Sequence, residues 1–594
     1  MRSPETVLGM LHDRGKRGLP VHDLYRQLYN PELYLRAYAR LYSHPGVMTT
    51  GATPETADAM SMQKILAIID CIRHERYRWT PARRITIPKK NGKTRPLGLP
   101  TWSDKLLQEV LRSLLEAYYE PQFSDFSHGF RPKRGCFTAL SHIQHAWTGT
   151  HWFIEGDIRH CFDALDHTVL LNILAERIPD PRFLRLIKHL LQAGYLEQWR
   201  YHTTYSGAPQ GGVLSPLLSN IYLNKLDLYV QEHLLPRFNQ GKRRKNNPVY
   251  AHYNRQAFAA RRQGDYRKAK EMTTLGQHHP RGDPNDPNYR RLRYVRYADD
   301  ILLGFAGPKH EAEEIKRLLK DFLGGTLHLE LSQEKTLITH ATTQPARFLG
   351  YEILTHRDDT QRSAKGSHKG RRTLGASIGL RVPADVVEHK CASYRKRGKP
   401  AARPSLISRD DVTILNTYQT EYRGIVQYYQ LAENIGWLAR LHWVMQQSAV
   451  RTLANKYRLR PRVIFRRYRA LIETPYGKRR CLQTVEQAAG GKKPRRAHFG
   501  GIPLRRNGHA LISEYIPTPF QYHRKELIRN MRADTCMLCG TRGNCEVHQV
   551  RKLAELDHVP PDLIPRWAFL MKKRRRKTLI VCQPCHRSIH HEER

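Results

Sequence analysis

Two adjacent carboxylates lie between runs of apolar residues in the segment Tyr297-Ala298-Asp299-Asp300. Residues 293–297 and 301–305 on either side are rich in Tyr, Val, Ile, Leu and Phe, which favours two strands joined by a tight turn. Carboxylate oxygens are the ligands that hard divalent cations prefer. Aspartate is also a common turn residue because its side chain bonds the local backbone, so this turn alone does not establish a metal site.

Another carboxylate ends a second apolar run, residues 152–157 (Trp-Phe-Ile-Glu-Gly-Asp), and a helix capped by Asp166 follows it. A charge at the end of a buried strand needs a partner or a cation, although Asp157 could also lie exposed just beyond the strand. Further along, the loop 206–216 carries two adjacent glycines before a helical pattern. Paired glycines allow a backbone to approach a ligand closely.

Four cysteines near the C-terminus form two pairs with the spacing of a structural zinc site. The pairs are Cys536 with Cys539 and Cys582 with Cys585. Four thiolates at about 2.3 Å from the ion make a closed tetrahedral shell with no open position for chemistry. We expect Cys545, a further thiol in this region, to be a bystander.

Histidines in the same region offer a second set of metal ligands. His586 and His590 are four residues apart and would share one face of a helix. Together with His548 they could bind a divalent metal. A basic run, residues 572–577, would suit DNA phosphates beside them.

The remaining elements are expected to position these groups. Residues 1–80 have helical periodicity and no recognisable chemistry, and residues 83–100 predict a basic hairpin around Asn91-Gly92 that could hold phosphates. A helix with a leucine face should begin near a cap at Ser103. Residues 235–289 predict a polar insertion with a basic helix and a loop, either RNA-binding or simply solvated.

The later part of the chain is predicted to contain packed helices from residue 410 to about residue 468. The tyrosines there have the spacing of core residues, and the end of the segment is strongly basic: Arg451, Lys456, Arg458, Arg460, Arg462, Arg466 and Arg467. Residues 476–530 look irregular and basic, which favours a DNA-binding linker.

Composition limits the class of partner. The chain has 594 residues and a formal charge of +46, so it should form several domains and attract a polyanion, with nucleic acid as the first candidate and an anionic membrane surface as the second. No apolar run approaches the length of a membrane span, and the N-terminus lacks the apolar core of a signal peptide. We therefore expect a cytoplasmic protein.

Taken in order, the motifs resemble the reverse transcriptases encoded by bacterial group II introns. The resemblance covers roughly residues 30 to 355 and includes the basic hairpin, the strand ending at Asp157, Pro-Gln-Gly-Gly-Val-Leu-Ser-Pro in the glycine loop, Tyr297-Ala298-Asp299-Asp300, Gln333-Glu334-Lys335-Thr336 and Phe348-Leu349-Gly350-Tyr351. It implies an α+β multidomain chain shaped like a right hand, with helical fingers, an α/β palm and a helical thumb, followed by a small zinc-bound HNH domain of the ββα-metal type.

The resemblance also implies domain bounds. Fingers and palm would occupy residues 1–375, the thumb or maturase domain 376–475, a DNA-binding linker 476–530 and the HNH-type domain 531–594.

The same resemblance implies roles for individual residues. Asp157 and Asp299, with the carbonyl of Ile158, would hold two Mg²⁺ ions for nucleotidyl transfer, and Asp300 would take a weaker part. Phe162 would exclude a ribose 2′-hydroxyl and Gln210 would line the nucleotide pocket. Triphosphate contacts are expected from Lys89 and Arg95, and proton donation to pyrophosphate from Lys335.

The C-terminal region resembles an HNH endonuclease domain with one departure. The family usually has a second histidine where this chain has Gln549, whose amide cannot accept a proton from water. No asparagine occurs where the family's orienting asparagine is expected, and His558 or His591 would have to act as the base. The alternative to DNA cleavage is a zinc-held DNA-binding module.

The sequence thus predicts a group II intron reverse transcriptase and maturase. Its expected partners are intron RNA, target DNA, a primer and deoxynucleoside triphosphates, with no membrane, in the bacterial cytoplasm near the nucleoid. Two alternatives are a splicing factor that only binds RNA and a retron or defence-type reverse transcriptase. The presence of both Asp157 and Asp299 disfavours the first, and the zinc tail disfavours the second. A homodimer is left open.

Overall fold

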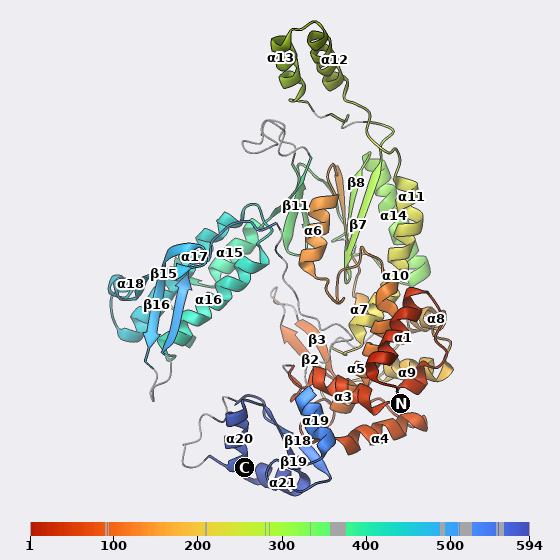
Figure 1. Cartoon of the computed structure of the whole chain (residues 1–594), viewed down its shortest axis with the longest axis vertical. Coiled ribbons are helices and arrows are strands. Elements are labelled where there is room, and N and C mark those ends of the chain that lie inside the picture. Colours follow the sequence, from red (N-terminus) through yellow and green to blue (C-terminus); the bar gives the residue numbers. More distant parts are fainter. Residues whose placement is uncertain are drawn as a thin grey trace.

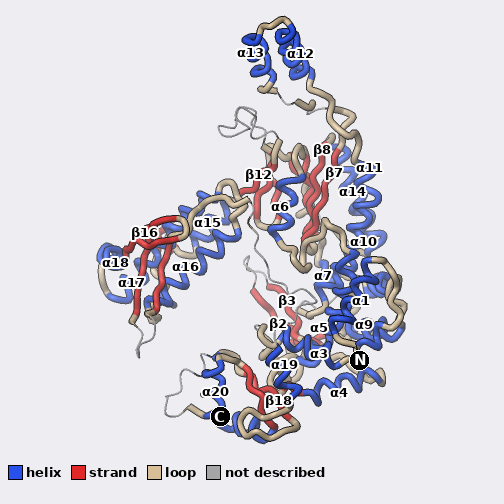
Figure 2. The backbone as a smooth tube through the Cα atoms, viewed as in Figure 1, coloured by secondary structure: helices blue, strands red, loops and turns tan. Residues whose placement is uncertain are grey.

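The chain is a mixed α/β molecule with several domains (Figure 1, Figure 2). The structure is a computed structural model, and it describes residues 2–592 except 45, 89–91, 93, 208–210, 280, 284–285, 333, 357–375, 488–493, 509, 511–524, 554–555 and 557–563. Among the described helices, none is long and apolar enough to cross a membrane.

Four helices precede one long helix, α5 (Trp102–Tyr119). They are α1 (Pro4–Lys16), α2 (Leu24–Gln27), α3 (Pro31–Leu41) and α4 (Met62–Arg73). Helices α1 and α3 pack on α5, α2 packs on α9 (Pro181–Gln192) and α4 packs on α3. Helix α5 is capped by Thr101, whose side chain accepts from the Asp104 amide, and not by Ser103 as expected. Ser103 instead lies inside the first turn, where its hydroxyl donates to Glu55. One more short helix, η1 (Glu120–Gln122), follows α5.

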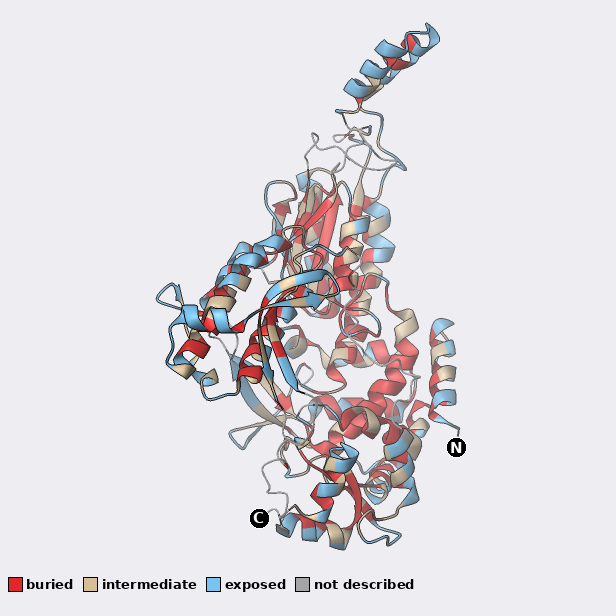
Figure 3. Cartoon of the chain, turned by 60° about the vertical axis from the view of Figure 1, so that its left-hand side comes forward, coloured by how far each residue is buried: buried red, intermediate tan, exposed pale blue. Residues whose placement is uncertain are grey.

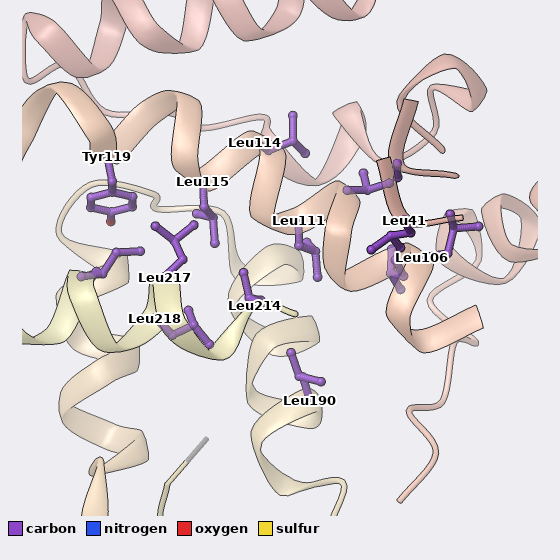
Figure 4. Packing of buried hydrophobic residues seen from close by; sticks show 14 of the residues in the cluster. Leu41, Leu106, Leu111, Leu114, Leu115, Tyr119, Leu190, Leu214, Leu217 and Leu218 are labelled. Carbon is purple, nitrogen blue, oxygen red and sulfur yellow. The ribbon is translucent and has the colours of Figure 1, made fainter. Parts of the chain in front are cut away.

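The leucine face of α5 forms the centre of the core. Figure 4 shows Leu111, Leu115 and Tyr119 facing the leucines at the start of α10 (Ser215–Tyr229), and Leu190 of α9 lies beyond Leu214 in the same cluster. Helix α1 approaches α5 so closely that a Cβ on Gly15 would lie 1.9 Å from the Tyr118 carbonyl oxygen, and only glycine fits there.

A four-stranded antiparallel sheet carries the three acidic residues. Its order is β7 (Arg291–Tyr297), β8 (Asp300–Ala306), β4 (Trp152–Asp157) and β9 (Ile338–His340). Alternate residues of these strands face opposite sides of the sheet. Ile154 and Leu303 pack with α14 (Lys309–Leu327), whereas Phe153 and Leu302 pack with α6 (Cys136–Ala146).

A second sheet contains the basic hairpin. Strands β2 (Ala82–Pro88) and β3 (Thr94–Leu99) form the hairpin, and β5 (Tyr195–Glu197) with β6 (Arg200–His202) completes the order β3-β2-β5-β6. Helices α7 (Cys161–Ala164) and α8 (His167–Ala175) connect β4 to α9. As expected, Asp166 caps α8, accepting from the amides of Thr168 and Val169.

The polar insertion is an antiparallel pair of helices, α12 (Pro248–Arg262) and α13 (Tyr266–Gly276), which project from the sheet (Figure 1). It follows α10 through a π-helical turn, η2 (Val230–Leu234), and α11 (Leu235–Phe238). The predicted helix is therefore present, but a second helix replaces part of the expected loop. Most of both helices is exposed (Figure 3).

The helical domain after the sheet has its own core. Strands β10 (Ala346–Phe348), β11 (Tyr351–Thr355) and β12 (Ile378–Arg381) lead to α15 (Ala384–Ala392), α16 (Asp411–Tyr428), α17 (Leu438–Tyr457) and α18 (Pro461–Tyr468). The short elements between them are β13 (Arg395–Lys396), β14 (Lys399–Pro400), η4 (Pro404–Leu406) and η5 (Ile435–Trp437). Tyr418 and Tyr422 are buried as predicted, whereas Trp437 is exposed.

The expectation of an irregular linker from residue 476 is wrong for its first part. Residues 477–486 and 495–500 belong to a three-stranded antiparallel sheet of β15 (Arg469–Thr474), β16 (Gly477–Glu486) and β17 (Arg495–Gly500). This sheet packs on α16, where the Gln419 side chain donates to the Gly500 carbonyl and accepts from its amide. Basic residues on the solvated face conceal the strand pattern in the sequence.

The C-terminal domain is small. It contains α19 (Lys525–Ala533), β18 (Cys545–Gln549), α20 (Arg566–Arg574), β19 (Thr578–Cys582) and α21 (Gln583–Glu592). A strand from the N-terminal region, β1 (Met60–Ser61), extends its sheet to the order β1-β18-β19. The first and last parts of the chain therefore share one sheet.

Candidate functional site

The acidic residues predicted to hold metal lie together at one edge of the four-stranded sheet. Asp157 ends β4 and is the direct partner of Asp300, the first residue of β8. Directly opposed residues of an antiparallel pair point to the same face of a sheet. Asp299 lies in the turn between β7 and β8, so the structure brings all three carboxylates into one region, as the sequence predicted.

Mutual repulsion and burial make this acidic group suited to a cation. Burial, together with the negative charges of Asp299 and Asp157, raises the pKa of Asp300 to about 6. Burial and the charge of Asp157 also raise the pKa of Asp299 above its usual value. Half-buried carboxylates of like charge need a compensating cation, and their oxygens fit Mg²⁺.

Lys335 compensates part of this charge. Its Nζ lies 2.9 Å from Oδ2 of Asp157, and this hydrogen bond raises the pKa of the lysine. The backbone explains the contact, because the Ser332 amide donates to the Asp157 carbonyl and the Arg159 amide donates to the Glu330 carbonyl. Ile158 lies opposite Leu331 between these two hydrogen bonds, so its own carbonyl does not bond the 330–332 segment. The carbonyl therefore points to the other edge of β4, on the side of β8.

A buried ion pair holds the turn that carries Asp299. The guanidinium of Arg296 is fully buried and lies 2.6 Å from Oδ2 of Asp227 on α10. It also donates to the carbonyl of Ala298, at 2.9 Å. Ala298 has a positive φ of 57°, an unfavourable conformation for alanine that such contacts maintain.

The segment 126–129 braces the same turn from outside the sheet. The Arg296 amide donates to the Phe126 carbonyl and the His128 amide donates to the Arg296 carbonyl. A Cβ on Gly129 would lie 2.4 Å from the Ala298 nitrogen, so only glycine allows this approach. Sequence reasoning did not identify these residues. The sequence does place Arg296 within an apolar strand and Asp227 within an apolar helix. Such charges need buried partners, so their positions could have indicated an ion pair.

The candidate nucleotide-binding residues are described only in part. Phe162 lies on α7, and its ring meets the Phe130 ring edge-on with 6.2 Å between centroids. Arg95 lies on β3, and its positive charge opposes the rise in the pKa of Asp299. Lys89 and Gln210 lie outside the described residues.

The glycine loop packs against the elements around it. The Gly207 amide donates to the Leu165 carbonyl at 2.7 Å, and a Cβ on Gly211 would lie 2.4 Å from the Gly98 carbonyl of the basic hairpin. Next to this loop is a cavity of about 360 Å³, lined among others by Arg84, Asp163 and Tyr205.

The four cysteines predicted to bind zinc converge. The sulfurs of Cys536, Cys539, Cys582 and Cys585 all lie within 4.8 Å of one another. The sulfurs of Cys539 and Cys582 are 3.6 Å apart, close to the roughly 3.8 Å expected for thiolates at about 2.3 Å from a tetrahedral ion. An all-sulfur donor set fits zinc. Cys545 is not among these four.

The three histidines also converge, and an unexpected residue joins them. His548, His586 and His590 form a cluster with Asp58, in which one ligand atom from each lies within 4.8 Å of the others. Burial lowers the pKa of His548 to about 4, which keeps its imidazole in the neutral form that binds metal. Asp58 comes from the N-terminal region, for which the sequence indicated no chemistry.

Gln549 is buried beside this cluster. Its side-chain amide donates to the Tyr42 carbonyl at 2.8 Å, and its backbone amide donates to Asp58 at 2.7 Å. Both contacts reach the N-terminal region. The position expected to hold a general base is therefore part of the contact between the first and last domains.

Three family models match successive parts of the chain. Residues 87–353 match "Reverse transcriptase (RNA-dependent DNA polymerase)", residues 384–479 match "Type II intron maturase", and residues 536–586 match "AI2M/AI1M-like, HNH endonuclease". The first match contains the acidic group, and the third contains the four cysteines together with His548 and His586, whereas Asp58 and His590 lie outside it.

Curated relatives span nearly the whole chain. The chain is 38% identical to the group II intron-encoded protein LtrA of Lactococcus lactis subsp. cremoris, with 96% of each chain covered. It is 32% identical to the putative COX1/OXI3 intron 1 protein of Saccharomyces cerevisiae, over 96% of this chain and 69% of that protein. Protein YkfC of Escherichia coli K12 is 32% identical over 60% of this chain and 88% of its own.

Proposed function

The chain belongs to the group II intron-encoded proteins, with reverse transcriptase, maturase and HNH-like domains, and from this premise we propose that Asp157, Asp299 and the Ile158 carbonyl form its polymerase centre. The chain is thus an RNA-directed DNA polymerase. The observation that carries the assignment of residues is the direct pairing of Asp157 with Asp300 beside the turn that holds Asp299.

In this proposal the chain's own groups orient the reaction. When bound, two Mg²⁺ ions activate the primer 3′-hydroxyl and stabilise the leaving oxygen. Asp157 and Asp299 would supply charged ligands for these ions, and the Ile158 carbonyl would supply a neutral one. Asp300 adds negative charge beside Asp157 and Asp299 and contributes less than they do to metal binding.

Cationic side chains act on the triphosphate. Arg95 on the hairpin contacts phosphate oxygens, together with Lys89. Lys335, whose Nζ lies 2.9 Å from Asp157, would donate its proton to the departing pyrophosphate. Phe162 lies five residues after Asp157 and blocks the 2′-hydroxyl of a ribonucleotide, while Gln210 lines the same pocket.

The proposed architecture is a right hand with a zinc-bound C-terminal domain. We assign residues 1–375 to fingers and palm, 376–500 to the thumb or maturase domain, 501–530 to a basic linker and 531–594 to the HNH-like domain. The four cysteines hold a structural zinc ion, and their convergence supports this. The thumb extends to residue 500 because β16 and β17 pack on α16.

The partners follow from the family and the charge. Intron RNA, a DNA target with its primer and deoxynucleoside triphosphates are the substrates and ligands, and a formal charge of +46 suits them. The maturase and HNH-like matches favour an intron protein over a retron or defence enzyme. The proposed location is the bacterial cytoplasm near the nucleoid. A homodimer remains a hypothesis that light scattering would test.

Primer extension on an RNA template tests the proposed centre. Asp299→Asn keeps the shape of the side chain but removes the charge, so DNA synthesis with Mg²⁺ should be lost. Asp321→Asn, an exposed aspartate on α14, is the matched control and should keep the parent rate. Synthesis by Asp299→Asn at the parent rate would refute the assignment.

A further inference from the structure

Four side chains from two ends of the chain form a set of metal ligands. Nε2 of His590 lies 2.9 Å from Oδ2 of Asp58, and Nε2 of His586 lies 3.3 Å from the same oxygen. Nδ1 of His548 lies 3.6 Å from Oδ1. We propose that Asp58, His548, His586 and His590 bind one divalent ion of the zinc class in a closed site that joins the N-terminal region to the HNH-like domain.

The donor set favours a structural site over a catalytic one. Three imidazoles and one carboxylate complete the tetrahedral shell that zinc prefers. A catalytic ion keeps one position open for water or substrate, and a nuclease needs that position for the scissile phosphate. In this chain the carboxylate of Asp58 occupies the position, so DNA phosphate cannot enter without displacing it.

The backbone holds Asp58 at the cluster. Strand β1 pairs with β18, with Met60 opposite Val547, and the Ala59 amide donates to the Val547 carbonyl at 3.0 Å. The Gln549 amide donates to Asp58 itself at 2.7 Å. A sheet shared by the N-terminal region and the HNH-like domain therefore holds the Asp58 carboxylate at the cluster. A chance surface contact would not include such backbone pairing.

A neighbouring carboxylate orients one of the histidines. Nδ1 of His586 lies 2.9 Å from Glu546, which in turn accepts from Gln583 at 3.0 Å. This contact directs Nε2 of His586 toward the other ligands, because the two ring nitrogens point in different directions. A carboxylate behind a ligating histidine is a common feature of metal sites.

Gln549 supports the same conclusion independently. Its side chain is buried and donates to Tyr42, so the position of the expected general base serves the contact between the domains. An ion pair between Glu32 on α3 and Arg532 on α19 adds to this contact. A cavity of about 300 Å³ borders Glu546, His586 and His590 and gives a metal ion a path of entry.

Metal content of the full-length protein tests the proposal. The parent should retain about two zinc ions per chain after purification, one at the cysteines and one at the mixed site. In Asp58→Asn, affinity at the mixed site should fall at least tenfold, since loss of a supporting residue alone costs that much. Titration with Co²⁺ separates the sites, because only the cysteine site gives thiolate absorption bands.

The matched control is Asp70→Asn, which removes an exposed carboxylate from α4 in the same region and should leave both sites unchanged. Primer extension on an RNA template reports whether each variant is folded, independently of this metal. A second measurement is amide hydrogen exchange: removing the metal should increase exchange at residues 59 and 546–549 in the parent, and Asp58→Asn should show this increase with zinc present.

Two results would overturn the proposal. One is a parent protein that binds zinc only at the cysteines. The other is an Asp58→Asn variant whose mixed site binds metal as tightly as the parent and whose residues 546–549 stay equally protected. Either result would leave the polymerase assignment untouched.

Discussion

Arg296 and Asp227 form a fully buried ion pair beneath the turn that carries Asp299, with 2.6 Å between guanidinium nitrogen and carboxylate oxygen. Tyr294 adds a hydrogen bond to the same aspartate, and Arg296 extends the network to Ala298. The pair therefore links helix α10 to the turn between β7 and β8, and the position of a proposed metal ligand depends on a charge in another element.

Breaking this pair should destabilise the fold strongly. Asp227→Ala leaves Arg296 as an uncompensated buried charge, which costs about 3–5 kcal/mol of the free energy of unfolding. Denaturant unfolding would measure the loss. The control is Glu176→Gln, which removes the exposed partner of Lys225 on the same helix α10 and should cost less than about 1 kcal/mol. Equal effects of the two substitutions would contradict the role of the buried pair.

His128 should make the fold sensitive to acid. Burial and the charge of Arg134 lower the pKa of this histidine to about 3, and its amide braces Arg296. The folded state thus favours the neutral ring. The free energy of unfolding is therefore highest above a pH of about 6.5, the ordinary pKa of histidine in the unfolded chain, and falls as the pH approaches 3. At pH 5 the free energy of unfolding should be about 2 kcal/mol lower than at neutral pH because of this histidine.

Thermal unfolding between pH 7 and pH 4 would measure this effect. His128→Gln stays neutral throughout, so its melting temperature should fall less on acidification than that of the parent. His310→Gln, an exposed substitution on α14, should follow the parent curve. Parallel curves for the parent and His128→Gln would count against the prediction.

Lys335 should affect chemistry more than binding. If it donates a proton to pyrophosphate, Lys335→Ala should slow single-nucleotide incorporation by about 10²-fold or more while primer-template affinity stays unchanged. Rapid-quench kinetics separates the two quantities. Lys320→Ala on α14 is the control for loss of an exposed lysine. A change in affinity alone would show that the lysine only binds the substrate.

Sequence patterns predicted those parts of the site that are formed by residues close together in the sequence. The alternation of apolar residues around Asp299 and Asp300 fixes a hairpin, and the paired spacing of Cys536 with Cys539 matches the geometry of a zinc site. The four-residue spacing of His586 and His590 likewise places both on one helix face.

Contacts between distant segments were not predictable from these patterns. Asp58 looks like one of many acidic residues in a helical region, and only the pairing of β1 with β18 brings it to the histidines. The partner of Arg296 is 69 residues away, and the strand pattern of β16 is concealed by exposed residues such as Arg480. Such contacts depend on the tertiary fold and leave no periodic signal.

The HNH-like domain should not cleave DNA. The orienting asparagine of the family is missing, and two further deficits separate this site from a nuclease: Gln549 cannot act as a base, and Asp58 fills the position that a scissile phosphate needs. Neither the parent nor Gln549→His should therefore nick duplex DNA, because the single change leaves the metal site closed. Only Asp58→Asn combined with Gln549→His both supplies a base and opens the ligand position, so weak cleavage at a saturating metal concentration is expected from this variant alone. Nicking of a supercoiled plasmid measures this, with the combined variant carrying His590→Ala as the inactive control. Cleavage by Gln549→His alone would mean that the site is open and that only the base is missing.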